Sequence, residues 1–274
     1  MVSHSRARLL NAIGINTISN VASANPELVR THPKVMYSKD ITFPTAFPLI
    51  IKYAQAISSK TPLVVGSHPA FSNPPRSPYY MDLEYDPQGT GTAGEVGIFV
   101  YGIMNSDGHI VQRFLDDPKK ERDHVEWFLS WLSKHRTVLI TYASKSADEP
   151  HLRNSLHKFN LPSEALSEAR FLDLYFDVIF TRSPDTQKIF LPLKDMGSKN
   201  VAEYFGFREP KNIRIHDGLG ALMAYNRYVR SKRKRIRKDI LAYNRCDLRR
   251  IKVIYERLGQ SFEEYHNTGK EDTV

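Results

Sequence analysis

The sequence Tyr-Met-Asp-Leu-Glu-Tyr-Asp-Pro, residues 80–87, alternates apolar and acidic side chains at the period of a β-strand. As a strand, this stretch projects Asp82 and Glu84 from one face and Met81 and Leu83 from the other. Two neighbouring carboxylates on a strand otherwise built for burial repel each other unless a cation lies between them. A solvent-exposed edge strand with two harmless acids is the alternative.

Outward from this strand, the pattern predicts further strands and helices. Asn-Ser-Asp-Gly at residues 105–108 is a strong hairpin-turn sequence, and apolar runs flank it on both sides. Strands are expected at residues 79–85, 94–104, 109–115 and 137–142, and helices at 49–57, 122–133, 149–159, 199–205, 219–228 and 239–257, while residues 171–180 suit either. A three-stranded meander followed by alternating elements predicts an α/β fold with a mixed sheet.

One further acid and a tyrosine–acid pair lie at informative places in these elements. Tyr243 and Asp247 are four residues apart, so they share one face of the last long helix. Asp148 follows the strand at 137–142 and precedes the helix at 149–159, where N-capping of the helix is a purely structural alternative. Each of these acidic features is a weak signal alone. The order in which they occur along the chain is informative.

The N-terminal part is expected to be helical and separate. Two short helices within residues 5–30 flank a turn at Gly14 and resemble a helix-hairpin-helix element, whose backbone amides contact nucleic-acid phosphates. An ordinary helical hairpin is the alternative. The Pro-rich stretch from Ser72 to Pro78 is interpreted as a linker. The expected division is a helical segment at 1–78, a domain at 79–258 and a loose polar tail at 259–274.

The composition narrows the class of protein and the kind of partner. The 274 residues include 39 Lys and Arg against 30 Asp and Glu, a formal net charge of +9, which favours a polyanionic partner such as nucleic acid. The single cysteine, Cys246, excludes an internal disulfide, and the ten histidines show no zinc-like pairing. No stretch approaches the roughly 20 apolar residues of a membrane span. We therefore expect a soluble cytoplasmic protein.

Two other motifs match functional patterns in their residues but not in their expected structural context. Gly-x-Gly-x-x-Gly at residues 89–94 fits a dinucleotide-binding fingerprint, but a strand is expected after it where that fingerprint needs a helix. We interpret it as a flexible hairpin beside Asp82 and Glu84. His-Asp-Gly at residues 216–218 is most simply a turn and a helix cap.

A dense basic run leads into the helix that carries Tyr243 and Asp247. Its eight cations are Arg227, Arg230, Lys232, Arg233, Lys234, Arg235, Arg237 and Lys238. Such a run most often forms a solvated face of a helix. Its place beside the acids favours a phosphate-binding surface, whose affinity should fall steeply as salt rises. Tyr225 and Tyr228 are expected in the core rather than stacked on bases.

Asp-x-Glu on the first strand, Asp at a strand-to-helix junction and Tyr-x-x-x-Asp on a late helix resemble the DEDD exonucleases. The chain is similar to the ribonuclease H-like exonuclease domain found at the C-terminal end of some RecB-type nucleases. The similar stretches are Tyr-Met-Asp-Leu-Glu-Tyr-Asp-Pro (80–87), Ile-Thr-Tyr-Ala-Ser-Lys-Ser-Ala-Asp-Glu-Pro-His-Leu (140–152), Phe-Leu-Asp-Leu (171–174), Gly-Ser-Lys-Asn-Val-Ala-Glu-Tyr-Phe-Gly-Phe (197–207) and Ile-Leu-Ala-Tyr-Asn-Arg-Cys-Asp-Leu (240–248). Many relatives have Asn in place of Ala143 and an aromatic residue in place of Ala147.

The resemblance implies a ribonuclease H-like mixed sheet flanked by helices and a metal-dependent 3′–5′ exonuclease acting on DNA or RNA, with single strands the expected substrate. It makes Asp82, Glu84, Asp148 and Asp247 the ligands of two Mg²⁺ or Mn²⁺ ions and gives Tyr243 the task of orienting the attacking water. It also suits a helicase or nuclease as partner protein. A non-catalytic nucleic-acid-binding module and a metal-dependent endonuclease remain as alternatives.

Overall fold

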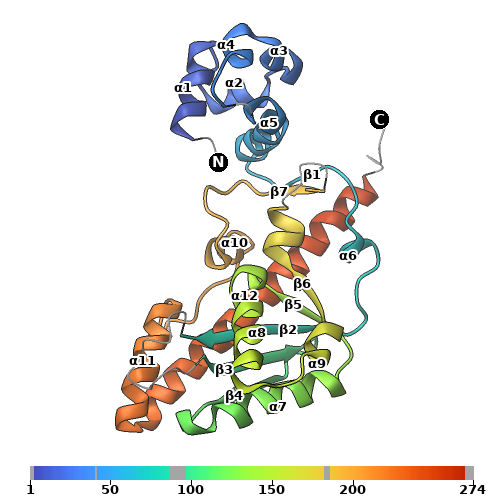
Figure 1. Cartoon of the computed structure of the whole chain (residues 1–274). Helices are drawn as coiled ribbons and strands as arrows, with labels where there is room; N and C mark the ends of the chain where they lie inside the picture. Colours follow the sequence, from blue (N-terminus) through green and yellow to red (C-terminus); the bar gives the residue numbers. More distant parts are fainter. Residues whose placement is uncertain (1–2, 41, 87–96, 182–185, 269–274) are drawn as a thin grey trace.

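Figure 1 shows an α/β body with a group of short helices above it. This computed structural model describes residues 3–40, 42–86, 97–181 and 186–268. The glycine motif at residues 89–94, predicted to be a flexible hairpin, lies outside these residues. None of the helices in the described ranges has the length and apolar character needed to cross a membrane.

The body is built on a five-stranded sheet with the strand order β4-β3-β2-β5-β6. The strands are β2 (Tyr79–Tyr85), β3 (Ile98–Asn105), β4 (Ile110–Phe114), β5 (Val138–Thr141) and β6 (Arg170–Asp173). The central strand, β2, is antiparallel to β3 and parallel to β5. The predicted α/β fold with a mixed sheet is confirmed. The edge-strand alternative for Asp82 and Glu84 is wrong, because β2 has a partner strand on each side.

Strands β3 and β4 form the predicted hairpin. The N–H of Gly108 donates to the Asn105 carbonyl (3.0 Å), and the N–H of His109 donates to the Asn105 side-chain oxygen (2.8 Å). Gly108 has a φ of +86°, which glycine adopts without steric cost. The register of this hairpin against β2 places Gly102 directly opposite Asp82.

Helices cover both faces of the sheet. On one face, Met81 and Leu83 of β2 pack with buried residues of α7, α8 and α9. On the other face α12 crosses β2 and β3, with α10 and α11 packed beside it. The bounds are α7 (Glu121–Lys134), α8 (Asp148–Phe159), α9 (Glu164–Glu168), α10 (Ser198–Tyr204), α11 (Gly218–Ser231) and α12 (Lys234–Asn267), with 3₁₀ turns η1 (Pro118–Lys120) and η2 (Ser144–Ser146).

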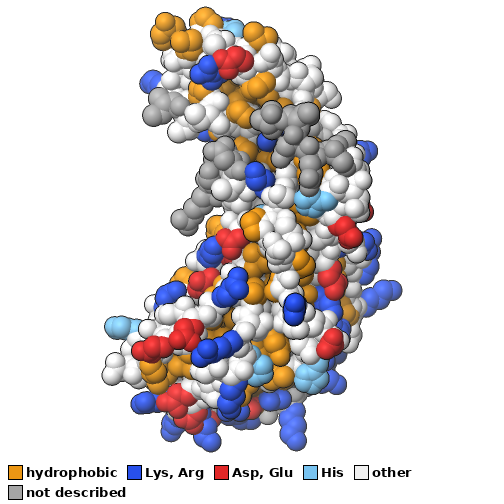
Figure 2. Space-filling view, turned by 90° about the vertical axis from the view of Figure 1, so that its right-hand side faces the viewer, with side chains coloured by type: hydrophobic (Ala, Val, Ile, Leu, Met, Phe, Trp, Pro, Cys, Tyr) orange, Lys and Arg blue, Asp and Glu red, His pale blue; other side chains and the backbone are white. Residues whose placement is uncertain are grey.

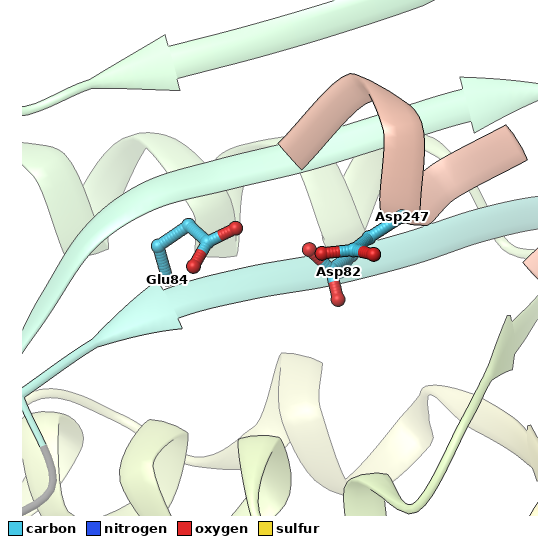
Figure 3. A group of neighbouring side chains, drawn as sticks. All are labelled: Asp82, Glu84 and Asp247. Carbon is cyan, nitrogen blue, oxygen red and sulfur yellow. The ribbon is translucent and has the colours of Figure 1, made fainter. Parts of the chain in front are cut away.

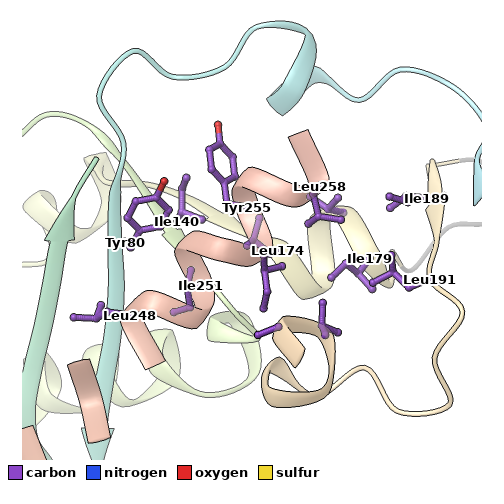
Figure 4. Close-up of a cluster of buried hydrophobic side chains, with 14 of the residues drawn as sticks. Tyr80, Ile140, Leu174, Ile179, Ile189, Leu191, Leu248, Ile251, Tyr255 and Leu258 are labelled. Atoms are coloured by element: carbon purple, nitrogen blue, oxygen red, sulfur yellow. The ribbon is translucent and has the colours of Figure 1, made fainter. Parts of the chain in front are cut away.

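Helix α12 continues to Asn267, so the expected loose tail is wrong for residues 259–267. The helix continues because Leu258 and Phe262 prolong its apolar face, and both are buried. Phe262 stacks on Phe71 of α6 (Pro69–Ser72), with ring centroids 4.9 Å apart. Figure 4 shows the apolar cluster that α12 forms with the sheet and the neighbouring helices.

The run at residues 171–180, which suited either a strand or a helix, contains both. Strand β6 ends at Asp173, and a π-helix, η3 (Leu174–Ile179), follows at once. The Asp173 carboxylate accepts hydrogen bonds from the amides of Tyr175 (3.0 Å) and Phe176 (3.2 Å). These bonds cap the π-helix and explain why the strand stops there.

Five N-terminal helices pack around a core of their own that includes Phe43 and Phe47. They are α1 (His4–Ala12), α2 (Ile18–Ala22), α3 (Pro26–Thr31), α4 (Pro33–Met36) and α5 (Phe43–Ser59). Helix α1 is followed by a turn at Gly14 (φ +84°), whose amide donates to Asn11, while the Ile15 amide donates to Leu10. The two predicted helices and the turn between them are present, a third helix, α3, follows in the same stretch, and these two turn amides already have partners. Phosphate contact by the hairpin stays a prediction for its other amides.

A two-stranded sheet and a polar contact join these helices to the body. Strand β1 (Leu63–Val64) is antiparallel to β7 (Ile189–Phe190). The buried Gln187 side chain donates to the Tyr53 hydroxyl of α5 (2.8 Å) and to the carbonyl of Ile179 (2.9 Å). The two parts of the chain therefore share both backbone and side-chain hydrogen bonds.

Candidate metal centre

Three carboxylates from two elements meet on the α12 side of the sheet. Asp82 and Glu84 come from β2 and Asp247 comes from α12, and one oxygen of each lies within 4.8 Å of the others. Figure 3 shows the three side chains together between the strand and the helix. Strand alternation places the first two on one face, and α12 crosses that face with Asp247 toward it. A cluster of this kind is a possible metal site.

Asp148 lines the same pocket without belonging to that close group. The pocket has a cavity volume of about 340 Å³, and its acidic and phenolic lining consists of Asp82, Glu84, Tyr85, Tyr142, Asp148, Tyr243 and Asp247. Asp148 is the first residue of α8, and its neighbour Ala147 holds the N-cap position, so Asp148 does not cap this helix. All five residues singled out from the sequence therefore line one pocket.

Burial raises the pKa of every acid in this pocket. For Asp82, loss of solvent is the largest cause, and the charges of Asp247, Glu84 and Asp148 add to it. Burial raises the pKa of Asp148 to about 8 and that of Asp247 to about 6. Among the described residues, the buried Oε1 of Glu84 has no hydrogen-bond partner. A divalent cation fits this donor set, because carboxylate oxygens are its preferred ligands and it removes the repulsion among them.

Asp247 is held in place from two sides. Arg250, one turn later on α12, donates to the Asp247 carboxylate and to Glu209 (2.8 Å). The Tyr243 hydroxyl also donates a hydrogen bond to Asp247. Burial and the nearby acids raise the pKa of Tyr243 far above its ordinary value. Tyr243 therefore stays protonated and can position a water molecule but not remove its proton.

Asn244, which was not predicted from the sequence, holds Asp82. Its side-chain nitrogen donates to Asp82 Oδ2 (2.8 Å) and to the Asp82 carbonyl (3.2 Å), and its oxygen accepts from Gln112 (2.8 Å). Asn244 is fully buried against Gly102, where an added Cβ would lie 2.1 Å from its oxygen. The glycine within the otherwise apolar strand β3 marks a close approach of some other group, but it does not identify Asn244 as that group.

A second missed residue, Asp173, organises the loop ahead of Asp148. Its buried carboxylate accepts from the amides of Ala143 (2.8 Å) and Lys145 (2.9 Å). These bonds hold Ala143 at a φ of +58°, in the left-handed region that a Cβ disfavours. The loop that presents Asp148 is thus fixed by an acid from the neighbouring strand.

The basic run lies at the corner between α11 and α12, ahead of the acids on α12. Of its eight cations, Arg237 is half-buried and the others are exposed. Arg237 donates to Asp116 (3.1 Å) and covers the Phe114 ring, and Lys232 donates to the Asp116 carbonyl (2.5 Å). These two cations therefore also hold the corner against the sheet.

The expectations for the neighbouring residues of α11 are confirmed. Tyr225 and Tyr228 are core residues, packed on Phe99 and Phe114. Asp217 is the N-cap of α11 and accepts from the amide of Gly220 (2.7 Å).

A sequence profile of the RNase H superfamily matches residues 79–259. The chain belongs to this superfamily, and the predicted ribonuclease H-like fold is confirmed. Among solved structures, the chain is similar to the family B DNA polymerase from the hyperthermophilic archaeon Pyrobaculum calidifontis, at 18% identity and a TM-score of 0.49, over 68% of this chain and 25% of the polymerase chain. No curated protein matches the chain. Members of this nuclease superfamily generally use divalent metals and bind nucleic acid.

Proposed function

We propose that this protein is a metal-dependent nuclease that removes nucleotides from the 3′ end of single-stranded DNA or RNA. The observation that carries the proposal is the meeting of Asp82, Glu84 and Asp247, with Asp148 in the same pocket. Four acids from three distant stretches of the sequence share one pocket, although their mutual repulsion opposes folding. The 3′–5′ direction and the removal of single nucleotides rest on the resemblance to DEDD exonucleases.

Each residue has a defined task in this proposal. Asp82, Glu84, Asp148 and Asp247 are the ligands of two Mg²⁺ or Mn²⁺ ions, which when bound supply an activated water and stabilise charge on the leaving oxygen. Tyr243 orients the attacking water by accepting a hydrogen bond from it, because its own proton is donated to Asp247. Asn244 and Arg250 hold Asp82 and Asp247 in place through the hydrogen bonds described above.

The cations of the basic run are the proposed contacts to the phosphates of the strand. They are Arg227, Arg230, Lys232, Arg233, Lys234, Arg235, Arg237 and Lys238, of which Lys232 and Arg237 also bind Asp116. Phosphate contacts release counterions, so binding should weaken steeply as salt rises. We also propose the division into residues 1–78 and 79–258 from the Pro-rich stretch between them, and a cytoplasmic location from the single cysteine. A helicase or nuclease partner is proposed from the resemblance.

The proposal is tested with 3′- and 5′-end-labelled single strands of DNA and RNA, incubated with Mg²⁺ or Mn²⁺. The wild type should shorten a 5′-labelled strand stepwise from its 3′ end. Asp82→Asn and Asp247→Asn should abolish shortening, because each removes a charged ligand. Asp123→Asn, a change at an exposed acid of α7, is the matched control and should keep full activity.

The other outcomes separate the alternatives. Internal cuts in a circular single strand would replace the exonuclease with an endonuclease. No turnover with any metal, together with salt-sensitive binding, would contradict the enzyme and leave a nucleic-acid-binding module.

A further inference from the structure

An apolar cleft lies between the N-terminal helices and the body. It has a cavity volume of about 670 Å³, and helices α2 and α5 form one wall while η3 and the loop before α10 form the other. Its aromatic lining consists of Tyr53, Tyr142, Tyr175 and Phe180. Figure 2 shows a notch in the outline of the molecule between the upper helices and the body. The volume is that of a site for a ligand of nucleotide size.

The cleft adjoins the acidic pocket. Tyr142 lines the cleft and also lines the pocket that contains Asp82, Glu84 and Asp148. Its hydroxyl donates to the carbonyl of Met196, which fixes the ring between the two cavities. Ser198 lines the cleft and a second cavity beside Asp247. A chain molecule bound at the carboxylates can therefore continue past Tyr142 into the cleft.

One aromatic side chain of the cleft, Phe180, is open to solvent and suits a flat partner. The ring of Phe180 is 42% exposed and lies 5.6 Å from that of Tyr175, at an angle of 25°. Tyr175 lies 5.8 Å from Tyr142 in turn. A row of rings of this kind accepts nucleobases, because every base has a π-face.

The charges at the mouth of the cleft suit a phosphate backbone outside it. Lys194 lines the cleft and is exposed, and Lys199 lines the cavity beside Asp247. The one carboxylate of the lining, Asp195, accepts from the amide of Gly197 (2.9 Å) and from Asn200 (2.8 Å). These bonds hold the Asp195 carboxylate within its own loop. The rest of the described cleft wall is mostly apolar.

We propose that this cleft binds unstacked bases of the same single strand whose scissile phosphate lies at the carboxylates. The N-terminal helices are then part of the substrate site. Paired bases cannot enter the cleft, because their faces are stacked and their edges are bonded, so the cleft selects single strands. This inference rests on the proposed function for the position of the scissile phosphate.

The test is a double-mutant cycle on binding. Fluorescence anisotropy with Ca²⁺ in place of Mg²⁺ gives the Kd of a single strand for the wild type, Phe180→Ala and the control Tyr37→Ala, an aromatic residue 86% exposed outside the cleft. Abasic residues are placed at each of the terminal positions of the strand in turn. Phe180→Ala should weaken binding about 5- to 150-fold, the effect of one lost stacking contact, and Tyr37→Ala should not.

The cycle also locates the contact. An abasic residue at the position that reaches the cleft should weaken wild-type binding and should cause no further loss in Phe180→Ala. If Phe180→Ala and all abasic strands keep the wild-type Kd while the wild type degrades the strand, the base-binding cleft is overturned and the nuclease stands. If the coupled loss occurs and no metal supports turnover, the nuclease is overturned and the base-binding cleft stands. Unchanged melting temperatures show that the variants are folded.

Discussion

Asn244 links the centre of the sheet to the last helix. It bridges the carboxylate of Asp82 on β2 and the side chain of Gln112 on β4, so it fixes the direction in which Asp82 points. This bridge exists because β3 passes beneath it with a glycine, Gly102, where no other side chain fits. The orientation of the candidate ligand therefore depends on a residue without a side chain.

Gly102→Ala should displace Asn244 and disturb Asp82. The added Cβ would lie 2.1 Å from the Asn244 oxygen, so the amide must move and lose its hydrogen bonds. We expect a loss of about 1–3 kcal/mol in the free energy of unfolding and a roughly 10- to 100-fold loss in Mn²⁺ affinity. Urea denaturation and a Mn²⁺ titration measure the two effects. Gly259→Ala, within α12, is the control and should be neutral or stabilising. Equal losses of stability and of Mn²⁺ affinity in the two variants would contradict this role of Gly102.

Ala143→Gly should stabilise the loop ahead of Asp148. Ala143 has a φ of +58°, and glycine adopts this conformation without the steric cost of a Cβ. The larger conformational entropy of glycine in the unfolded chain offsets part of this relief. The expected net increase in the free energy of unfolding is about 0.5–1 kcal/mol, measured by urea denaturation. Ala147→Gly, at a φ of −129°, should bring no gain. A destabilised Ala143→Gly would show that the loop is not strained.

Single residues could be predicted from the sequence only where strand or helix periodicity fixes a direction. Asp82 and Glu84 follow from a period of two, and Tyr243 and Asp247 from a spacing of four. Asn244 and Asp173 could not be predicted, because their partners lie on strands whose neighbours are set by the fold as a whole. No local pattern contains that information.

Helix α12 is the element that unites the site with the core. Tyr243, Asn244 and Asp247 lie near its start, and Ile254, Leu258 and Phe262 anchor its second half in the largest apolar cluster. The anchor matters for the site, because a helix that shifts on the sheet moves Asp247 away from Asp82.

Phe262→Ala should therefore cost about 3–5 kcal/mol in the free energy of unfolding, the usual loss for a buried phenylalanine. Phe262 is 1% exposed and stacks on Phe71. Glu263→Ala, the exposed neighbour on the same helix, should change stability by less than about 0.5 kcal/mol. Similar stabilities of both variants in urea would show that the end of α12 is frayed.

Most elements of the body could be predicted, and the exceptions have physical causes. Most strands and longer helices from Tyr79 to Arg257 show clear periods; residues 171–180 suited either element, and the short helix α9 was not predicted. The helix beyond residue 259 was missed, because its polar residues outnumber the few apolar ones that bury it. The pairing of β1 with β7 was missed, because two-residue strands far apart in sequence leave no periodic signal.

For the whole molecule, the buried acids make stability depend on pH and on metal. Burial raises the pKa of Asp247 to about 6 and of Asp148 to about 8, from an ordinary value of 3.8, so the folded chain binds more protons than the unfolded chain. The contribution of these two carboxyl groups to the free energy of unfolding therefore falls as the pH rises from about 4 to about 8.

We expect the melting temperature in EDTA to fall as the pH rises across this window, and less so in Asp148→Asn. Mn²⁺ binds the deprotonated carboxylates, so it should raise the melting temperature more at about pH 8 than at about pH 5. A metal-induced shift that is larger at low pH would contradict this account of the acids.

The most direct measurement is a Mn²⁺ titration of the free protein near pH 8, with unbound ion followed by electron paramagnetic resonance. If the four acids form a two-metal centre, the wild type and Asp123→Asn bind two Mn²⁺ ions per chain, and Asp82→Asn combined with Asp247→Asn binds none. Wild-type Mn²⁺ binding by the double variant, or no binding by the wild type, would contradict the metal centre on which the proposed nuclease depends.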